Sequence, residues 1–211
     1  MTSEMSKIPR RLIVGISGAS GVAHGIRLLE LLGPTDIETH LVMSKAAEMT
    51  LAYETDYSAA DVRALANASY ANADIGAGPA SGSFRSLGMV VAPCSIRSMS
   101  EIATGVTSGL LTRAADVMLK ERRRLVLMVR ETPLHAGHLR SMTQLAELGA
   151  IIAPPVPAFY PRPESLDKMI DHTVGRILDL FDIDIGTVER WREDGGKKPL
   201  LRPVAGSKRD G

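Results

Sequence analysis

Short apolar segments alternate with segments of helical periodicity along most of this 211-residue chain. Residues 11–17 (RLIVGIS) form an apolar run, and hydrophobic residues at 22, 26, 29 and 32 then recur at helical spacing before Gly33 and Pro34. This pattern predicts a strand followed by an amphipathic helix. By the same criteria, further strands are expected at 38–43, 88–93, 125–130 and 150–153.

Helices are predicted between and after these strands. Ser44 is placed to cap a helix that runs through residues 46–53. Other helices are expected at 56–67, 98–123, 135–148 and 166–181. Residues 72–82 are expected to form a loop, and five prolines between 154 and 163 exclude regular structure there.

This alternation sets the fold class. Short, mostly apolar strands that are each followed by a helix indicate an α/β protein whose parallel sheet is covered on both faces. We therefore predict a three-layer Rossmann-like (flavodoxin-like) fold with a mostly parallel sheet. The length suits one domain, which we place at residues 1–192, with the Gly-, Lys-, Arg- and Pro-rich residues 193–211 as a flexible tail.

Composition removes several classes of function. A formal net charge of +1 gives no reason to expect nucleic acid or a membrane surface as a partner, and no apolar run approaches the length of a membrane span. The only cysteine, Cys94, cannot form an internal disulfide. Residues 1–10 lack the apolar centre of a signal peptide, so we expect a cytoplasmic location.

The stretch GISGASG at residues 15–21 places small residues where the first strand passes into the first helix. Bare backbone there lets an anion approach the N–H groups and the positive end of the helix dipole, so we expect a phosphate at the start of this helix. A tight turn also needs glycine, and the stretch alone leaves that alternative open. The three-glycine dinucleotide pattern is absent, which favours a mononucleotide.

Polar residues follow the other predicted strands as well, and ligands of open parallel sheets bind at the carboxyl ends of the strands. The residues in question are Ser20, Ser44, the run Cys94 to Ser98, and Arg130 to Thr132, and Cys94 is a candidate nucleophile. Simpler interpretations exist: Ser44 as a plain helix cap, Cys94 as a small buried side chain, and Arg130 with Glu131 as an ion pair on a loop.

Five long segments resemble the UbiX/Pad family of flavin prenyltransferases, in the order found in that family. They are GISGASG (15–21), SKAAEMTLAYET (44–55), GSFRSLGMVVAPCSIRSMSEIATG (82–105), LLTRAADVMLKERRRLVLMVRETPLH (110–135) and GAIIAPPVPAFYPRPES (149–165). The resemblance covers nearly all of residues 10–192. The family belongs to a broader group of homo-oligomeric flavoproteins that includes cysteine decarboxylases.

The resemblance implies an activity and its partners. The enzyme would join a dimethylallyl group from dimethylallyl phosphate to N5 and C6 of reduced FMN. The product, prenylated FMN, would become the cofactor of a UbiD-type decarboxylase. A homo-oligomer, a dodecamer by family resemblance, is implied as well. No Asp, Glu or His cluster has metal-ligand spacing, so we expect no metal.

The resemblance also assigns site residues by position. The positions that match FMN contacts are Gly18, Ala19, Ser20, Ser44, Ser95, Ile96, Arg97, Ser98 and Arg130. The positions that match the surroundings of dimethylallyl phosphate are Lys120, Arg130, Glu131, Tyr160 and Arg176, and Trp191 matches an aromatic residue near the same site.

The chemistry of the reaction gives these residues roles. The basic residues Lys120, Arg130 and Arg176 are expected to stabilise charge on the departing phosphate. Glu131 is the candidate for removing the proton from C6 and for donating a proton to the phosphate.

Tyr160 and Trp191 are expected to act near the allyl cation. Either aromatic ring would add a cation-π contribution. The proline-rich loop that carries Tyr160 would cover the site and exclude water.

Two alternatives remain from the sequence. One is an FMN-dependent decarboxylase of the same flavoprotein group, although the chain has PPVPAFYPRP where those enzymes carry an Asn- and Met-rich substrate segment. The other is a non-catalytic flavin-carrier subunit of an aromatic-acid decarboxylase, against which the joint presence of Lys120, Glu131, Tyr160 and Arg176 argues.

Overall fold

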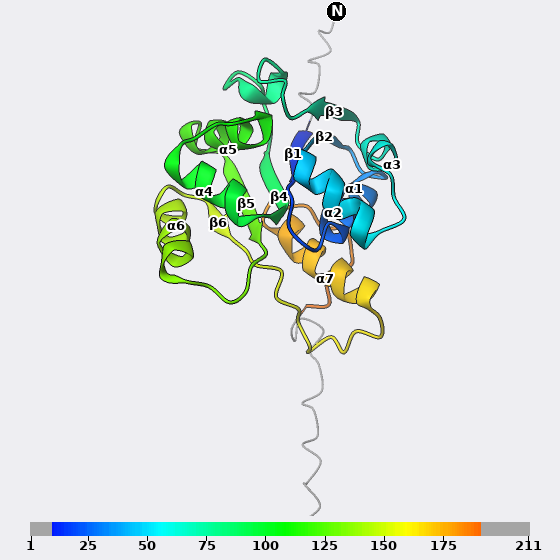
Figure 1. Cartoon of the computed structure of the whole chain (residues 1–211). Helices are drawn as coiled ribbons and strands as arrows, with labels where there is room; N and C mark the ends of the chain where they lie inside the picture. The colour runs from blue at the N-terminus through cyan, green and yellow to red at the C-terminus, as the bar shows by residue number, and fades with distance from the viewer. Residues whose placement is uncertain (1–9, 191–211) are drawn as a thin grey trace, which may run out of the picture.

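Strands and helices alternate along the chain and build three layers, with the sheet in the middle (Figure 1). The computed structural model describes residues 10–190. The strands are β1 (Arg10–Ile16), β2 (Ile37–Met43), β3 (Ala68–Ala71), β4 (Gly88–Cys94), β5 (Arg124–Val129) and β6 (Ile151–Ile152). The helices are α1 (Ala23–Leu32), α2 (Lys45–Glu54), α3 (Ala59–Ala64), α4 (Ile96–Thr104), α5 (Leu110–Lys120), α6 (Ala136–Glu147) and α7 (Leu166–Asp179), with a 3₁₀ turn at Gly78–Ala80.

The described strands form one parallel sheet in the order β3-β2-β1-β4-β5-β6. This is the strand order of a Rossmann sheet, whose direction of winding reverses between β1 and β4. The prediction of an α/β, three-layer Rossmann-like fold is confirmed. A ligand site is therefore expected at the carboxyl ends of β1 and β4, where the connections lead to opposite faces.

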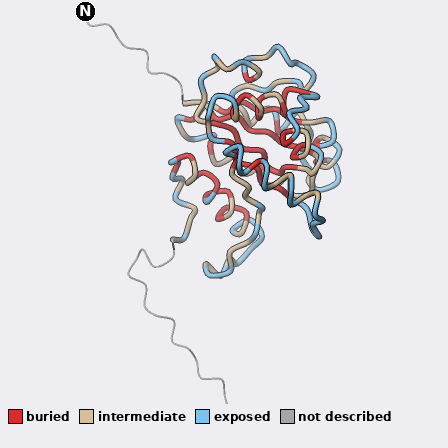
Figure 2. Tube along the Cα trace, turned by 90° about the vertical axis from the view of Figure 1, so that its left-hand side faces the viewer, coloured by how far each residue is buried: buried red, intermediate tan, exposed pale blue. Residues whose placement is uncertain are grey.

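Both faces of the sheet are buried, as the near-continuous apolar strands predicted (Figure 2). Alternate residues of β1 serve opposite faces: Leu12, Val14 and Ile16 pack with α1, α2 and α7, whereas Ile13 packs with α4 and α5. These two cores fix the strand ends relative to each other, so the connecting loops rest on a rigid base.

The structure corrects the sequence interpretation in three places. The helix expected at 56–67 is the shorter α3, and residues 68–71 form the edge strand β3, which was not predicted. The helical stretch expected at 98–123 is two helices, because Gly105 adopts a φ of 71° and ends α4. Glycine adopts this left-handed conformation without the steric penalty that other residues incur.

The remaining predicted elements are present, with small changes in their limits. Residues 153–165 form no regular structure, and α7 follows them. Among the hydrophobic residues of α7, Ile170, Ile177 and Leu178 are buried, whereas Leu166 is 70% exposed. The predicted site residue Trp191, the ends of the proposed domain at 1–192 and the proposed tail at 193–211 lie outside the described residues. No helix within residues 10–190 is both long and apolar enough to span a membrane.

Candidate active site

The loops that follow β1, β2, β4 and β5 meet at the carboxyl edge of the sheet. Buried Ser17, directly after β1, joins two of them: its hydroxyl donates to the Pro93 carbonyl at 2.8 Å and accepts the Ser95 N–H at 2.7 Å. Arg130, directly after β5, donates its N–H to the Cys94 carbonyl at 3.1 Å. The ends of β1, β4 and β5 are therefore held side by side by hydrogen bonds.

The bare turn after β1 has a packing reason as well as a chemical one. A Cβ at Gly18 would lie 2.3 Å from the Cβ of Ala46 in the first turn of α2, so only glycine allows the two loops to approach this closely. Small residues here bring the starts of α1 and α2 together.

The start of α1 is already occupied by a carboxylate of the chain itself. The backbone N–H groups of Gly21 and Val22 donate to Glu54 Oε2 at 2.8 and 3.2 Å. Val22 provides no side-chain cap for α1, so Glu54 takes that role from the end of α2. The expected exposure of N–H groups in this turn therefore fails at Gly21, whose N–H is already satisfied by an anion 33 residues away in the sequence.

Glu54 is the site residue that the sequence interpretation missed. Burial by itself raises the pKa of its carboxyl, but hydrogen bonds from the Ser20 hydroxyl and two backbone N–H groups, together with the positive charge of Arg130, outweigh this and lower the pKa. The carboxylate is therefore ionised at neutral pH. Ser20, Glu54 and Arg130 form one polar cluster beside the β1–β4 switch point.

A cavity of about 270 Å³ opens next to this cluster. It is bounded by the loops after β1, β2 and β4 and by the first turn of α5. Its lining residues are Gly18, Ser44, Lys45, Ala46, Asn72, Ser95, Arg97, Ser98, Glu101, Ser108, Leu111 and Thr112. Of the predicted FMN contacts, Gly18, Ser44, Ser95, Arg97 and Ser98 thus line one cavity.

Two helix N-termini border this cavity. The Ser44 hydroxyl accepts the Ala47 N–H at 3.1 Å and begins α2, which confirms the predicted cap. The Ser95 hydroxyl accepts the Ser98 N–H at 3.2 Å and begins α4. Because the positive ends of two helix dipoles and their first N–H groups meet here, the cavity suits a phosphate better than the start of α1 does. Ile96, also in the first turn of α4, is partly buried against the core instead.

Arg130 and Glu131 lie exposed at the same edge of the sheet. The Glu131 carboxylate accepts the N–H of Thr132 at 3.0 Å, which keeps it on the loop surface. Within the described part of the chain, Arg130 and Glu131 are not joined as an ion pair. The simpler interpretation, an ion pair between these two residues, is therefore not supported. Both side chains face solvent at the position where a ligand of the sheet would lie.

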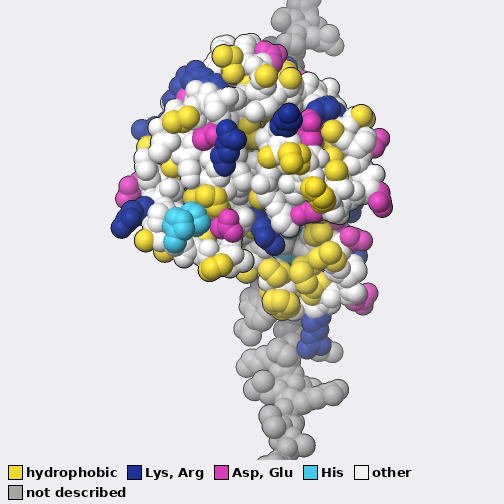
Figure 3. Space-filling model, in the orientation of Figure 1, with side chains coloured by type: hydrophobic (Ala, Val, Ile, Leu, Met, Phe, Trp, Pro, Cys, Tyr) yellow, Lys and Arg dark blue, Asp and Glu magenta, His cyan; other side chains and the backbone are white. Residues whose placement is uncertain are grey.

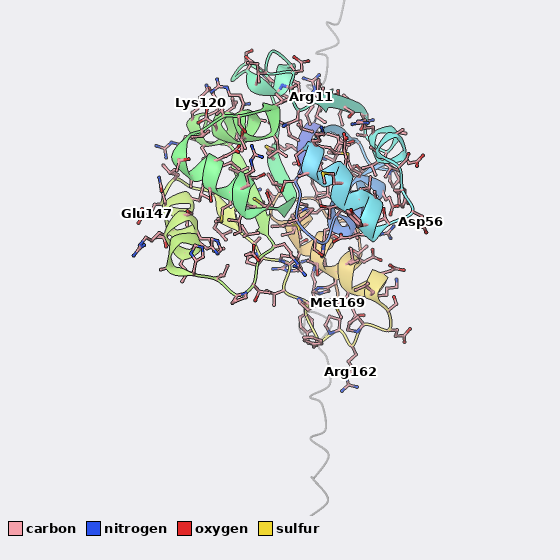
Figure 4. The ribbon with its side chains drawn as sticks, viewed as in Figure 1. Arg11, Asp56, Lys120, Glu147, Arg162 and Met169 are labelled. Atoms are coloured by element: carbon pink, nitrogen blue, oxygen red, sulfur yellow. The ribbon has the colours of Figure 1, made fainter. Side chains whose placement is uncertain are left out.

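Lys120 lies at the other end of β5 from this cluster. It is the last residue of α5, just before β5 begins, and its ammonium group pairs with Glu121. Six residues of strand separate it from Arg130, which corresponds to roughly 20 Å. Figure 4 shows Lys120 at the opposite end of the molecule from Arg162, which lies in the proline-rich loop. One copy of the chain does not bring Lys120 to the predicted site.

Arg176 is directed away from the cluster too. It lies in the last turn of α7, where it pairs with Asp179 at 2.7 Å. Just beyond this turn, Asp182 pairs at 3.6 Å with Arg124, the first residue of β5. The end of α7 therefore lies at the amino edge of the sheet, opposite the cavity.

Tyr160 is held by the last described part of the chain. Its hydroxyl lies 3.0 Å from Nε2 of His172 and donates to the Glu189 carbonyl at 2.9 Å. These contacts fix the proline-rich loop against α7. They position Tyr160 next to α7, where the residue is 44% exposed.

Cys94 has no role as a nucleophile in this structure. It is fully buried at the end of β4, and burial raises the pKa of its thiol to about 12.

We expect the native protein to resist thiol reagents at pH 8 and the unfolded protein to react with one equivalent through Cys94, because only the exposed thiolate is reactive. A timed assay with a chromogenic disulfide, with and without denaturant, measures this; rapid reaction of the folded protein would contradict it.

Comparison with known proteins places this fold in a family. The Flavoprotein family model matches residues 1–189. Flavin prenyltransferase UbiX of Escherichia coli K12 is 63% identical over 186 residues, which cover 87% of this chain and 98% of that protein. The chain belongs to the UbiX family of flavin prenyltransferases. The prediction made from its sequence motifs is confirmed.

Solved structures of UbiX proteins share the whole fold. The crystal structure of AnUbiX (PadA1) in complex with FMN and dimethylallyl pyrophosphate has a TM-score of 0.85 and 53% identity, covering 86% of this chain and 97% of that one. A dodecameric FMN-dependent Ubix-like decarboxylase from Escherichia coli O157:H7 has a TM-score of 0.84 and 48% identity, covering 86% and 98%. The described α/β core is thus the UbiX-family core.

Proposed function

We propose that this protein is a flavin prenyltransferase that joins the dimethylallyl group of dimethylallyl phosphate to N5 and C6 of reduced FMN. The observation that supports this proposal most is that five of the residues at the family's FMN positions line one cavity. The chain is also 63% identical to a UbiX protein over 87% of its length. Bound reduced FMN would supply the electron-rich ring that accepts the allyl group. The product would be prenylated FMN.

The cavity beside α2 and α4 fits the phosphate end of FMN. Ser44, Ser95 and Ser98 supply hydroxyl groups, and the first N–H groups of two helices point toward the same space. The flavin ring would then extend along the carboxyl edge of the sheet toward Ser20 and Arg130. This assignment replaces the start of α1 as the phosphate site, because Glu54 fills that position.

Arg130 and Glu131 would act on the reacting groups. A guanidinium at the strand edge stabilises negative charge that develops on the departing phosphate. An exposed carboxylate beside it accepts the proton that leaves the flavin C6 and donates one to the phosphate. The Glu54 carboxylate holds the Ser20 hydroxyl and the turn after β1 in place.

Lys120 and Arg176 would reach the flavin from neighbouring copies of the chain. Within one copy, Lys120 and Arg176 lie toward the edge of the sheet opposite the cavity, so an assembly must supply them. The exposed apolar side chains of Val156, Phe159 and Leu166 give a surface for such contacts. Figure 3 shows hydrophobic side chains gathered at the lower end of the molecule in that view. The dodecamer of the Ubix-like decarboxylase is consistent with a homo-oligomer.

Subunit mixing tests this shared site. Lys120→Ala alone and Arg130→Ala alone are each expected to lower activity. When the two variants are co-expressed, about one site in four combines an intact Lys120 from one copy with an intact Arg130 from another, and these sites are expected to be active. Arg130→Ala co-expressed with Glu131→Gln is the matched control and should not recover, because both residues belong to the same copy. Equal activity of the two mixtures would place Lys120 outside the shared site.

The decisive test of the activity is anaerobic incubation with reduced FMN and dimethylallyl phosphate or dimethylallyl pyrophosphate, followed by mass analysis of the flavin. A flavin heavier by one C₅H₈ unit is expected, with the two donors compared side by side. Release of CO₂ from an acid without a modified flavin would favour the decarboxylase alternative. Flavin binding without either reaction would favour the carrier subunit.

We further propose that the product serves a UbiD-type decarboxylase. The filtered product flavin, added to such an apo-decarboxylase, is expected to produce decarboxylation of an aromatic or unsaturated acid. FMN passed through the same procedure without the donor is the control and should leave the apo-enzyme inactive.

A further inference from the structure

A carboxylate lies in the wall of the proposed phosphate cavity, where a phosphate would be repelled. Glu101 on α4 lines the cavity, and its side chain is only 16% exposed. Burial raises the pKa of this carboxyl, but hydrogen bonds from the Ser108 hydroxyl and the Arg97 side chain, together with the Arg97 charge, outweigh burial and lower it. Glu101 is therefore an anion at neutral pH, inside a site proposed for another anion.

Glu101 also engages donors that a phosphate would use. Arg97 Nε donates to Glu101 Oε1 at 2.8 Å, and the Ser108 hydroxyl donates to Glu101 Oε2. The Thr112 hydroxyl, also in the cavity wall, donates instead to the Gly109 carbonyl at 3.2 Å. Arg97 and Ser108 both line the cavity, so the hydrogens that these two side chains could offer a phosphate oxygen are directed toward Glu101.

The surroundings do not require a carboxylate for folding. The Arg97 side chain is 82% exposed and lies one turn before Glu101, a pairing that contributes only a few tenths of a kcal/mol on a helix surface. The end of α4 is formed by Gly105, and its start is capped by Ser95. A neutral group of the same shape at residue 101 can keep the helix intact.

We propose that Glu101 is an internal competitor of the flavin phosphate, which limits the affinity for FMN and speeds release of the flavin product. The proposal rests on the proposed function, since it takes the cavity as the phosphate site. An enzyme that passes its product to another protein needs such release. When a phosphate enters, Arg97 and Ser108 turn from the carboxylate to the phosphate oxygens, and Glu101 loses these partners. That loss offsets part of the binding free energy.

The test compares FMN with riboflavin, which lacks the phosphate, on the wild-type chain and on Glu101→Gln. The variant removes the charge and weakens the acceptor while keeping the size of the side chain. We expect FMN to bind roughly tenfold more tightly and to dissociate correspondingly more slowly, because a like charge has left the site. Riboflavin affinity is expected to stay within about twofold, since riboflavin carries no phosphate to be repelled.

Glu147→Gln, on the exposed face of α6, is the matched control and should change neither affinity. Weaker or equal FMN binding by Glu101→Gln would overturn the proposal and make Glu101 a residue that positions Arg97 and Ser108. A parallel gain for riboflavin would also overturn it, because the effect would then not depend on the phosphate. Failure of the wild-type chain to bind FMN would instead reject the proposed function.

Discussion

Glu131→Gln is expected to lower the rate of flavin prenylation by roughly 10²- to 10⁴-fold while FMN still binds, which is the usual loss when a positioned proton-transfer group is removed. The amide keeps the size of the side chain and its acceptor oxygen, so the contact with the Thr132 N–H can persist. Single-turnover formation of prenylated FMN, followed by mass analysis, measures the rate. Fluorescence titration measures FMN binding.

Glu147→Gln is a suitable control for this variant. Glu147 is an exposed glutamate on α6, away from the proposed site residues. Near-normal prenylation by Glu131→Gln would exclude the acid/base role. Loss of FMN binding in Glu131→Gln would show that the residue supports the site structurally.

Ser95→Asp is expected to weaken FMN binding about a hundredfold or more, whereas Ser95→Asn weakens it only slightly. Aspartate and asparagine both cap helices well, so each should preserve the start of α4 that the Ser95 hydroxyl now caps. Only aspartate adds a negative charge to the cavity wall. Two unit charges about 4 Å apart near a protein surface repel by about 4 kcal/mol before salt screening.

The pair of Ser95 variants separates charge from structure. Thermal unfolding should show similar stability for both, and titration with FMN should show the difference. Equal FMN affinities for Ser95→Asp and Ser95→Asn would move the phosphate away from this cavity. A large loss for both variants would mean that the Ser95 hydroxyl itself, through its contact with Ser98, organises the site.

The local sequence was sufficient to predict most helices and strands. It was insufficient for elements that form only through contacts with distant parts of the chain. The apolar runs of β1, β4 and β5 carry their own signal, since both faces of a parallel sheet are buried. The edge strand β3, with the sequence ASYA, alternates between intermediate and exposed residues and has no such run. Its pairing with β2 is a tertiary contact, which explains why residues 68–71 were not predicted.

The same distinction applies within the site. Ser44 could be chosen from sequence because a helix cap is defined by the few residues around it. Ser95 could be chosen because it follows an apolar strand and lies in a contiguous family motif. Glu54 could not, because its function depends on the end of α2 meeting the start of α1, and nothing near residue 54 indicates that meeting. The expectation of exposed N–H groups after β1 fails at Gly21 for this reason.

By itself, the sequence determined the parallel α/β architecture, the family and the set of polar residues at strand ends, because each depends on periodicity or on contiguous motifs. Tertiary structure alone decided which of these residues meet. Packing places Ser44, Ser95 and Ser98 around one cavity, whereas the length of β5 separates Lys120 from Arg130 by roughly 20 Å. Spatial proximity depends on how strands and helices stack, and a motif of neighbouring residues carries no record of that stacking.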